Sequence, residues 1–226
     1  MEDIKCCATF NSKAERRQHI SKIHSDRESR TCCGETFKTW RLLKKHKQQV
    51  HEDKAILCSL QTKLHDGRMS TIFYSGWHPF STFYRAPITI AGVVYRTSEQ
   101  YYQAEKAKYF NDWTTYWKIM NTWSPFLAKQ HGKHVNGYQE DQWMLVANDV
   151  MDYAVREKVR QHPDVEQLLL NTGDDVLAEA TKFDSYWASG IDVAEPTINA
   201  LSQWIGKNKL DEILMNIRQE IRREKQ

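Results

Sequence analysis

The chain has 226 residues and a formal net charge of +3, and this length suits one domain of ordinary size together with a smaller unit. No apolar run is long enough to span a bilayer, and the N-terminus has no apolar signal core, which argues against membrane-spanning and secreted classes. The five cysteines are odd in number and do not suit a secreted disulfide framework. We therefore expect a protein of the cytoplasm or nucleus, without a membrane partner, whose thiols are reduced or bind metal.

Residues 1–55 form a basic segment that contains an internal repeat. The segment has 13 Lys plus Arg and 8 Asp plus Glu, so the positive charge of the chain is concentrated there. The pattern C-x3-F-x8-H-x4-H occurs twice in it, with the second copy shifted by 27 residues. This pattern resembles the second half of a C2H2 zinc finger, in which one helix carries both histidines.

The first half of each repeat departs from the finger pattern. Asp3 and Arg30 stand where a finger has its other Cys, and each repeat instead has two adjacent cysteines, whose side chains point apart on an extended strand. Two interpretations remain open: the repeats bind structural zinc, or they are degenerate fingers that keep a helical shape without metal. Basic side chains in the repeats suit contacts to nucleic acid, although fingers also bind proteins. The candidate zinc ligands are Cys6, Cys7, His19, His24, Cys32, Cys33, His46 and His51.

Residues 56–69 are interpreted as a linker, and residues 70–226 as a second, larger domain. Near its start, 71–74 has the composition of a strand. Two further short strands, 88–90 and 93–95, flank the dipeptide Ala-Gly, which predicts a tight hairpin.

A helix is predicted to begin at Thr97, and it carries the polar pattern around which the domain is organised. Thr97 is a good N-cap, and Gln100 completes a capping box. Glu99, Gln103 and Lys106 recur at i, i+4 and i+7 and therefore share one face of this helix. They either line a pocket or belong to a capped amphipathic helix with a surface carboxylate, and the spacing alone favours the second interpretation.

The rest of the domain has mainly helical patterns. Ser124-Pro125 starts a helix that Gly132 ends. The spacing of apolar residues predicts three more helices, at 140–161, 164–170 and 209–222. The sequence thus predicts a mainly α, multihelical domain with a small β hairpin, preceded by two small finger-like units.

Several motifs of this domain, taken in order, resemble the NADAR (YbiA-like) family. The longest is Tyr95-x-Thr97-x-Glu99-Gln100-Tyr101-Tyr102-Gln103-Ala104-x-Lys106. The others are Phe73-Tyr74, Pro79-Phe80-Ser81-Thr82-Phe83, Ser124-Pro125, Ala128-Lys129, Gly132, Leu169-Leu170-Asn171-Thr172-Gly173-Asp174, Glu179-Ala180, Asp184-x-x-Trp187, Trp204-x-Gly206-x-Asn208 and Leu214-Met215-x-x-Arg218. The resemblance covers 70–220 and implies a YbiA-like N-glycosidase domain that needs no cofactor for catalysis.

The resemblance, together with the residue types, indicates three catalytic groups. Cleavage of a glycosidic bond passes through a sugar cation, and a pair of carboxylates supplies acid and base or nucleophile. Glu99, in the first turn of its helix, would stabilise the cation or orient a water. Asp184 has apolar neighbours that suit an acid, although it also fits a turn cap. Lys106 would bind phosphate or attack the sugar as an amine, or it only pairs with a neighbouring carboxylate.

A further set of residues is expected to bind the substrate. Trp187 would stack on the base, or it is a core tryptophan. Gly173 and its polar neighbours would bind ribose hydroxyls, or they only end a helix. Two positions depart from the family pattern: Thr82 stands where Asn is common, and Ala188 replaces the first glycine of Trp-Gly-x-Gly. The full set is Trp187, Phe80, Ser81, Tyr102, Gln103, Thr172, Gly173 and Asp174.

The resemblance implies an enzyme, and two alternatives stay open beside it. The expected activity is hydrolysis of the bond between a phosphorylated ribose and a nitrogen base, as in early intermediates of riboflavin biosynthesis. The first alternative is removal of ADP-ribose from guanine in nucleic acid, with the basic segment holding the polymer. The second is a non-catalytic module that binds ADP-ribose or a nucleotide. The retained carboxylates favour an enzyme, and the altered motif at 187–190 favours a binding module.

Overall fold

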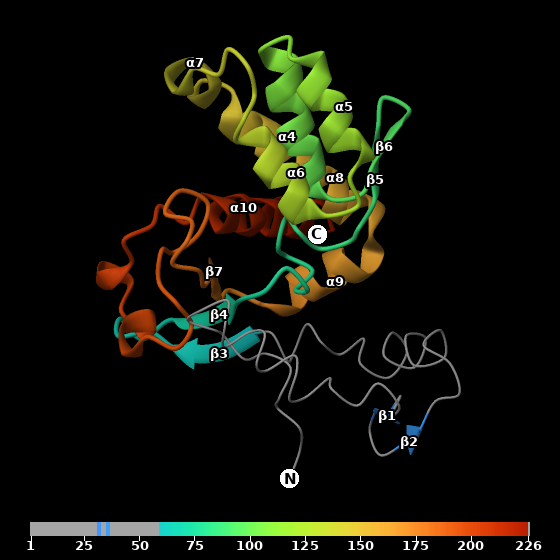
Figure 1. Ribbon diagram of the computed structural model, residues 1–226. Helices are drawn as coiled ribbons and strands as arrows, with labels where there is room; N and C mark the ends of the chain where they lie inside the picture. Colours follow the sequence, from blue (N-terminus) through green and yellow to red (C-terminus); the bar gives the residue numbers. More distant parts are fainter. Residues whose placement is uncertain (1–30, 33–34, 37–58, 226) are drawn as a thin grey trace. The chain divides into compact units, whose positions relative to one another are not determined.

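The structure is a computed structural model that describes residues 31–32, 35–36 and 59–225 (Figure 1). The chain divides into two units, Met1–Lys54 and Ala55–Gln226. In the first unit, the described strands β1 (Thr31–Cys32) and β2 (Glu35–Thr36) form an antiparallel pair. The side chains expected to bind zinc or nucleic acid there lie outside the described ones, so both expectations stay predictions.

The second unit begins with a strand where the sequence predicts a linker. Its three-stranded sheet has the order β3 (Ser59–Lys63), β4 (Met69–Phe73) and β7 (Val176–Glu179), with β3 antiparallel and β7 parallel to β4. The predicted linker at 56–69 is therefore wrong for residues 59–63. The reason is that β3 is a mostly polar edge strand held by backbone pairing, and it lacks the apolar alternation that marks a half-buried strand.

The segment between the parallel strands β4 and β7 is a long crossover that contains most of the helices. A parallel pair requires such a connection because a tight turn cannot join strands that run the same way. The crossover starts with the predicted hairpin, β5 (Ile88–Ile90) paired with β6 (Val93–Tyr95). Its turn residues Ala91 and Gly92 both have positive φ, 49° and 78°, as a type I′ turn requires.

The domain is mainly helical, as the sequence predicts. One prediction is wrong, because the single helix expected at 140–161 is two helices. Leu145 and Val146 separate them by donating to carbonyls three residues back, while the apolar spacing continues through the break and does not reveal it. Among the described residues, no helix is both long and apolar enough to cross a membrane. The helices are α4 (Ser98–Tyr109), α5 (Trp113–Asn121), α6 (Pro125–Gly132), α7 (Glu140–Met144), α8 (Ala147–Gln161), α9 (Pro163–Asn171) and α10 (Lys209–Glu224), with short 3-10 turns η1 (Pro196–Asn199) and η2 (Leu201–Gln203).

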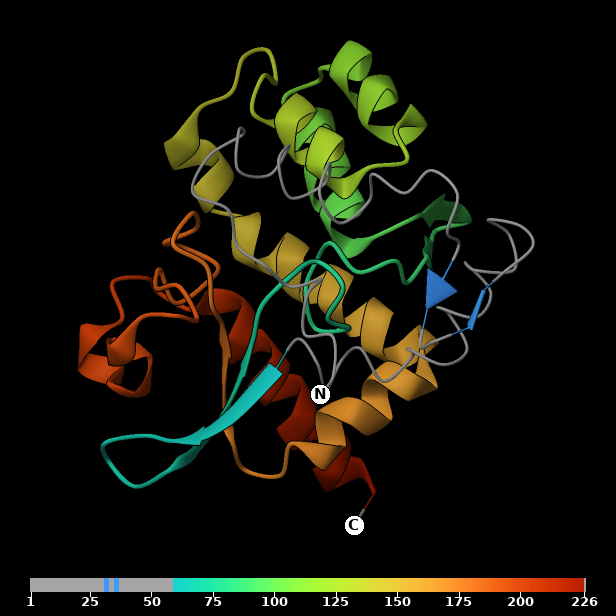
Figure 2. The same ribbon diagram turned by 60° about the horizontal axis from the view of Figure 1, so that its bottom comes forward.

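Helix α8 connects the two sides of the domain. It packs against α4 on one side and against α10 on the other, so it runs between the group α4–α6 and the C-terminal helix (Figure 2). Helix α10 in turn packs against β7. A shared core that includes Trp143, Met151, Leu177 and Leu214 joins the helices to the sheet.

Helix α8 also buries a cation. Lys158 is fully buried, and its ammonium donates to the carbonyls of Pro79, Phe80 and Ser81 at 2.8, 3.0 and 3.2 Å. Burial lowers the pKa of Lys158 to about 7. It follows Met151 by seven residues and therefore continues the buried stripe of the helix. Lys158 thus fixes the loop that directs Ser81 toward the candidate active site.

Candidate active site

The start of α4 holds Glu99 in a buried position. Thr97 caps the helix by accepting a hydrogen bond from the Gln100 N–H at 3.1 Å, as predicted. Glu99 is only 4% exposed, and its carboxylate oxygens accept from Thr82 Oγ1 at 2.9 Å and Gln103 Nε2 at 2.8 Å. The interpretation of a surface carboxylate is therefore wrong. Thr82 makes a polar contact at the position where the family often has Asn.

The side chain of Gln103 occupies space that Gly132 leaves open. A Cβ at Gly132 would lie 1.8 Å from Gln103 Oε1 and 2.6 Å from its Cδ, distances that no real contact reaches. Gln103 Oε1 is buried and has no hydrogen-bond partner among the described residues. The glycine that ends α6 therefore makes room for the amide that orients Glu99.

Replacing Gly132 by Ala should disturb Glu99 through Gln103. The new methyl group displaces the amide and breaks its hydrogen bond to the carboxylate, so we expect a loss of about 1–3 kcal/mol in the free energy of unfolding. Denaturant unfolding measures this loss. The matched control is the same substitution in a Gln103→Ala background, where the contacts to Oε1 and Cδ are gone and only a tight contact of 3.1 Å to the Cβ of residue 103 remains, so the cost should be smaller. An equal cost in both backgrounds would show that the clash involves another group.

Lys106 lies on the same face of α4, two turns after Glu99. It is 9% exposed, and within the described part of the chain its ammonium makes no hydrogen bond or ion pair. The ammonium lies 5.2 Å from the centre of the Tyr138 ring. Burial lowers the pKa of Lys106 to about 8, although the charge of Glu99 opposes this. Lys106 therefore has donors to offer an anionic group of a ligand.

Asp184 lies in the loop after β7 and is paired with a lysine from α6. Its Oδ2 accepts from Lys129 Nζ at 2.9 Å, and its Oδ1 accepts from the N–H groups of Tyr186 and Trp187 at 3.2 and 2.9 Å. These three donors fix the position of the carboxyl group. Burial lowers the pKa of Lys129, but the charges of Glu99 and Asp184 outweigh burial, so the pKa is raised. Lys129 is thus paired with Asp184 and lies within the electrostatic influence of Glu99.

A third carboxyl group, Glu179, was not predicted. It is the last residue of β7, and its N–H donates to the buried Asp211 carboxyl at 2.8 Å. The nearby Ser81 side chain acts to lower the pKa of its carboxyl group. Burial of the carboxyl, reinforced by the charge of Asp184, raises the pKa of Glu179 to about 7, although part of the residue is exposed. The sequence signal for it was the motif Glu179-Ala180 of the family resemblance, to which no role was assigned from the sequence.

Aromatic rings lie beside these polar groups. Trp143 Nε1 donates to Tyr102 Oη at 2.8 Å, so Tyr102 is fixed in the core. Burial raises the pKa of Tyr102. The Trp187 ring lies 5.5 Å from Tyr102 and nearly perpendicular to it, at 84°. Trp187 is only partly buried, and this combination of a fixed neighbour and an accessible surface suits stacking on a ligand ring.

Phe80 has a different place from the one predicted. It is fully buried in the core, where its ring contacts Phe73 and His78 edge-on. Burial, together with the charge of Lys158, lowers the pKa of His78 to about 3, so this neighbour is neutral. The loop thus presents Ser81 to the polar cluster and anchors itself with Phe80.

The predicted ribose-binding motif 172–174 lies apart from the cluster. It precedes β7 and is therefore at the opposite end of that strand from Glu179. Arg218 donates to Thr172 Oγ1 at 2.5 Å, and Arg222 donates to Gly173 O and Asp174 Oδ1, both at 2.6 Å. These contacts tie α10 to the start of β7. The structure thus supports the alternative in which this motif is structural.

The altered motif at 187–190 pairs through its backbone with the segment before α10. The N–H groups of Gly206 and Asn208 donate to Ser189 O and Ala188 O at 2.8 and 3.1 Å. A Cβ at Gly206 would lie 2.1 Å from Ala188 O, which explains the glycine there. Ala188 is itself fully buried. The pairing is made with alanine at this position, and the preceding Trp187 keeps its contact with Tyr102.

The cluster combines groups of opposite charge from four segments. Glu99 and Lys106 come from α4, Lys129 from α6, Glu179 from the end of β7 and Asp184 from the following loop. Such a set can stabilise a cation, donate a proton and hold an anion. In the described part of the chain, no three His, Cys, Asp or Glu side chains are arranged to hold a metal ion.

Comparison with known proteins identifies the family of this chain. Residues 65–222 match the NADAR domain. The chain is 33% identical to an N-glycosidase of Nostoc punctiforme, over 68% of this chain and 94% of that protein. It is also 33% identical to N-glycosidase YbiA of Escherichia coli, over 68% and 89%, and 31% identical to a riboflavin biosynthesis protein of Vibrio vulnificus, over 62% and 35%. The NMR structure of E. coli YbiA superposes with a TM-score of 0.57 at 33% identity, covering 68% of this chain and 85% of that one. This chain belongs to the NADAR family.

Proposed function

We propose that this protein is an N-glycosidase that hydrolyses the bond between a phosphorylated ribose and a nitrogen base. The observation that carries the proposal is the convergence of three carboxyl groups with two lysines in one partly buried cluster. The names of relatives matched over most of their length support the reaction class. The name of a more distant relative supports intermediates of riboflavin biosynthesis as substrates.

In the proposed reaction, water adds to C1′ of the ribose while the bond from C1′ to nitrogen breaks and a proton reaches the leaving nitrogen. The transition state resembles an oxocarbenium ion. Glu99, with two donors on its carboxylate, is placed to stabilise that positive charge or to orient the water. A carboxyl group with a pKa near the working pH is an effective proton donor, and Glu179 meets this condition.

The acid assignment differs from the one based on the sequence. Asp184 accepts one hydrogen bond from Lys129 and two from backbone N–H groups, so both of its carboxyl oxygens are already engaged by donors of the protein. Its negative charge also raises the pKa of Glu179. We therefore assign proton donation to Glu179 and a supporting electrostatic role to Asp184.

Two residues point to the class of substrate. Lys106 has an ammonium without a protein acceptor among the described residues and suits a phosphate or another anionic group. Trp187 is held at the edge of the core and suits a planar base. A phosphorylated ribose joined to a nitrogen heterocycle offers a partner to each.

The test uses the full-length protein and three substrates: an early phosphorylated intermediate of riboflavin biosynthesis, its dephosphorylated form, and an oligonucleotide with ADP-ribosylated guanine. Release of the free base is measured by mass spectrometry. We expect the phosphorylated intermediate to be hydrolysed, and kcat/KM for its dephosphorylated form to be roughly 10- to 100-fold lower, because a charged hydrogen-bond partner is lost.

A Lys106→Met variant should lose most of this discrimination while it retains the fold. Preferred hydrolysis of the ADP-ribosylated substrate would assign the activity to that class instead. Binding of all three substrates without release of any base would contradict the enzyme and support a binding module.

A further inference from the structure

The segment 113–139, which covers α5, α6 and the loop after α6, has an unusual charge distribution. It contains Lys118, Lys129 and Lys133 and two histidines, but no Asp or Glu. The surrounding domain has the opposite tendency, because residues 56–226 hold 19 Lys plus Arg and 21 Asp plus Glu. The positive charge of this segment is therefore a local feature.

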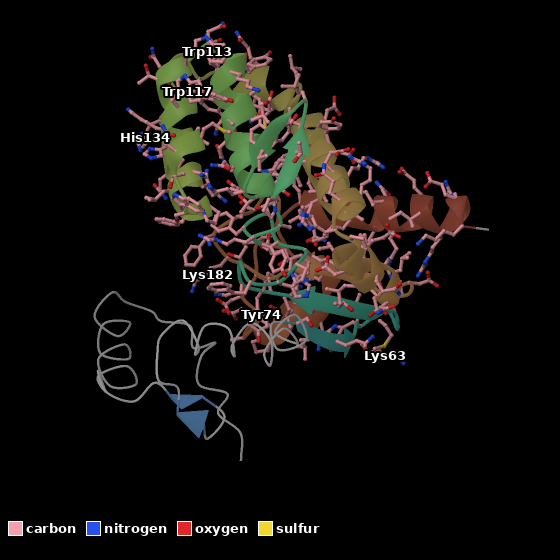
Figure 3. All side chains as sticks on the ribbon, turned by 90° about the vertical axis from the view of Figure 1, so that its right-hand side faces the viewer. Lys63, Tyr74, Trp113, Trp117, His134 and Lys182 are labelled. Atoms are coloured by element: carbon pink, nitrogen blue, oxygen red, sulfur yellow. The ribbon has the colours of Figure 1, made fainter. Side chains whose placement is uncertain are left out.

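The same segment exposes large aromatic side chains. Trp113, Trp117 and Trp123 are 53%, 59% and 68% exposed, and Phe126 is 59% exposed. Trp113 and Trp117 are one helical turn apart and share a face of α5. Figure 3 shows both of them, followed by His134, along the outer side of the helices α5 and α6. Helices α5 and α6 pack against each other. We call the four rings, together with Lys118, Lys129 and Lys133, the α5–α6 surface.

The ring of Trp123 is held in place by Arg96. The guanidinium of Arg96 lies 4.2 Å from the centre of the Trp123 ring and donates to Met120 O at 2.7 Å. Arg85 also donates to Trp123 O, at 3.2 Å. The ring is therefore held from one side by a cation while it remains 68% exposed. An exposed ring of fixed orientation loses little conformational entropy when a ligand ring stacks on it.

We propose that the α5–α6 surface binds single-stranded nucleic acid. Exposed aromatic rings among cations are what such binding uses, because the bases stack on the rings and the cations meet the phosphates. At α6, Lys129 is three residues after Phe126 and is ion-paired with Asp184, so the surface adjoins the polar cluster. This inference rests on exposure and charge and does not depend on the proposed N-glycosidase activity.

The charge of the surface argues against a second copy of this chain as its occupant. A second copy in a two-fold symmetric contact would place the same cations against each other. An acidic protein matches the charge but offers few rings to stack on tryptophan, whereas nucleic acid supplies both phosphates and bases.

The test measures where an oligonucleotide contacts the full-length protein. A fluorescent deoxythymidine 15-mer gives the affinity by anisotropy, and a 5-bromodeoxyuridine version is cross-linked by ultraviolet light and mapped by mass spectrometry. We expect cross-links within 113–126. We also expect Trp117→Ala and Trp123→Ala to weaken binding by roughly 10-fold each, because each loses a stacked base. Substituting Lys118 and Lys133 together by Gln should make the slope of log Kd against log salt shallower by about 1 to 1.5.

The matched control is Tyr153→Ala, which removes a ring that is 45% exposed on α8, outside the α5–α6 surface. This variant should bind like the wild type. Absence of binding at low salt would overturn the proposal, as would cross-links confined to residues before 59 with no effect of the tryptophan variants. Equal competition by poly-glutamate would also overturn it, because a partner without bases would then suffice.

Discussion

Glu99→Gln should abolish most turnover while the protein stays folded. The substitution removes a negative charge at nearly constant shape, at a position where Thr82 and Gln103 both donate to the carboxylate. Stabilisation of an oxocarbenium-like transition state depends on that charge. We expect kcat/KM to fall by roughly 10³-fold, with circular dichroism and thermal unfolding used to check the fold.

The matched control for Glu99→Gln lies on the same helix. Glu105 is partly exposed and is paired with Lys108 at 2.6 Å, so Glu105→Gln removes the same charge from α4 without touching the cluster. It should keep turnover within a few-fold of the wild type. Near wild-type turnover by Glu99→Gln would mean that Glu99 is structural, and equal losses in both variants would point to a general effect of charge on α4.

The sequence predicts those parts of the site that depend on local order. The cap at Thr97 and the spacing of Glu99, Gln103 and Lys106 belong to one helix, so their common face follows from helical geometry. Such reasoning does not show burial, because exposure depends on what packs over the face. In this fold α6 and the loop with Thr82 cover it, and a surface interpretation of Glu99 was therefore the wrong one.

The parts that could not be predicted depend on pairing between distant segments. Glu179 is brought to Ser81 because β7 pairs in parallel with β4, 106 residues away in sequence at Ser70 and Val176. The strand β7 has only four residues, and so short a pattern does not predict which strand it pairs with. The edge strand β3 was missed for a different reason, its mostly polar sequence, and a truncated protein that starts near Met69 would lose it.

The family motifs identify the important residues of the domain. They are less reliable as a guide to the role of each residue. Gly132, Glu179-Ala180 and Trp204-x-Gly206-x-Asn208 were all among the motifs. The structure gives them separate tasks: space for Gln103, a carboxyl of raised pKa, and close backbone pairing with Ala188. The motif 172–174 is a contrasting case, because its contacts tie α10 to β7.

The second large effect concerns Glu179 and the pH dependence of turnover. The pKa of Glu179 is raised to about 7, so an acid at this position is protonated below pH 7 and loses its proton above it. We expect kcat/KM of the wild type to be level below about pH 7 and to fall about tenfold per pH unit above it. Glu179→Gln should lower the plateau by roughly 10²- to 10⁴-fold and remove this decline.

The raised pKa of Glu179 also predicts that the free energy of unfolding depends on pH. A folded-state pKa above the unfolded value means that the folded protein binds more protons between pH 4.5 and about 7, so its free energy of unfolding falls as the pH rises through that window. Glu179→Gln should show a smaller fall than the wild type, and the part that remains comes from the buried Asp211, whose pKa is raised by burial as well. Glu212→Gln is the control, because Glu212 is 48% exposed and paired with Lys209 outside the cluster, and it should retain the wild-type dependence.

Substitutions of neighbouring charges distinguish Glu179 from any other acid. The negative charge of Asp184 raises the pKa of Glu179 and the positive charge of Lys129 lowers it. Asp184→Asn should therefore shift the alkaline decline of kcat/KM to lower pH, whereas Lys129→Met should shift it to higher pH, whatever each does to the plateau. Both shifts are measured from pH profiles of single variants in the same buffer series. A decline that stays near pH 7 in both variants, or one that persists in Glu179→Gln, would assign the acid to a different group and leave Glu179 as a buried partner of Ser81.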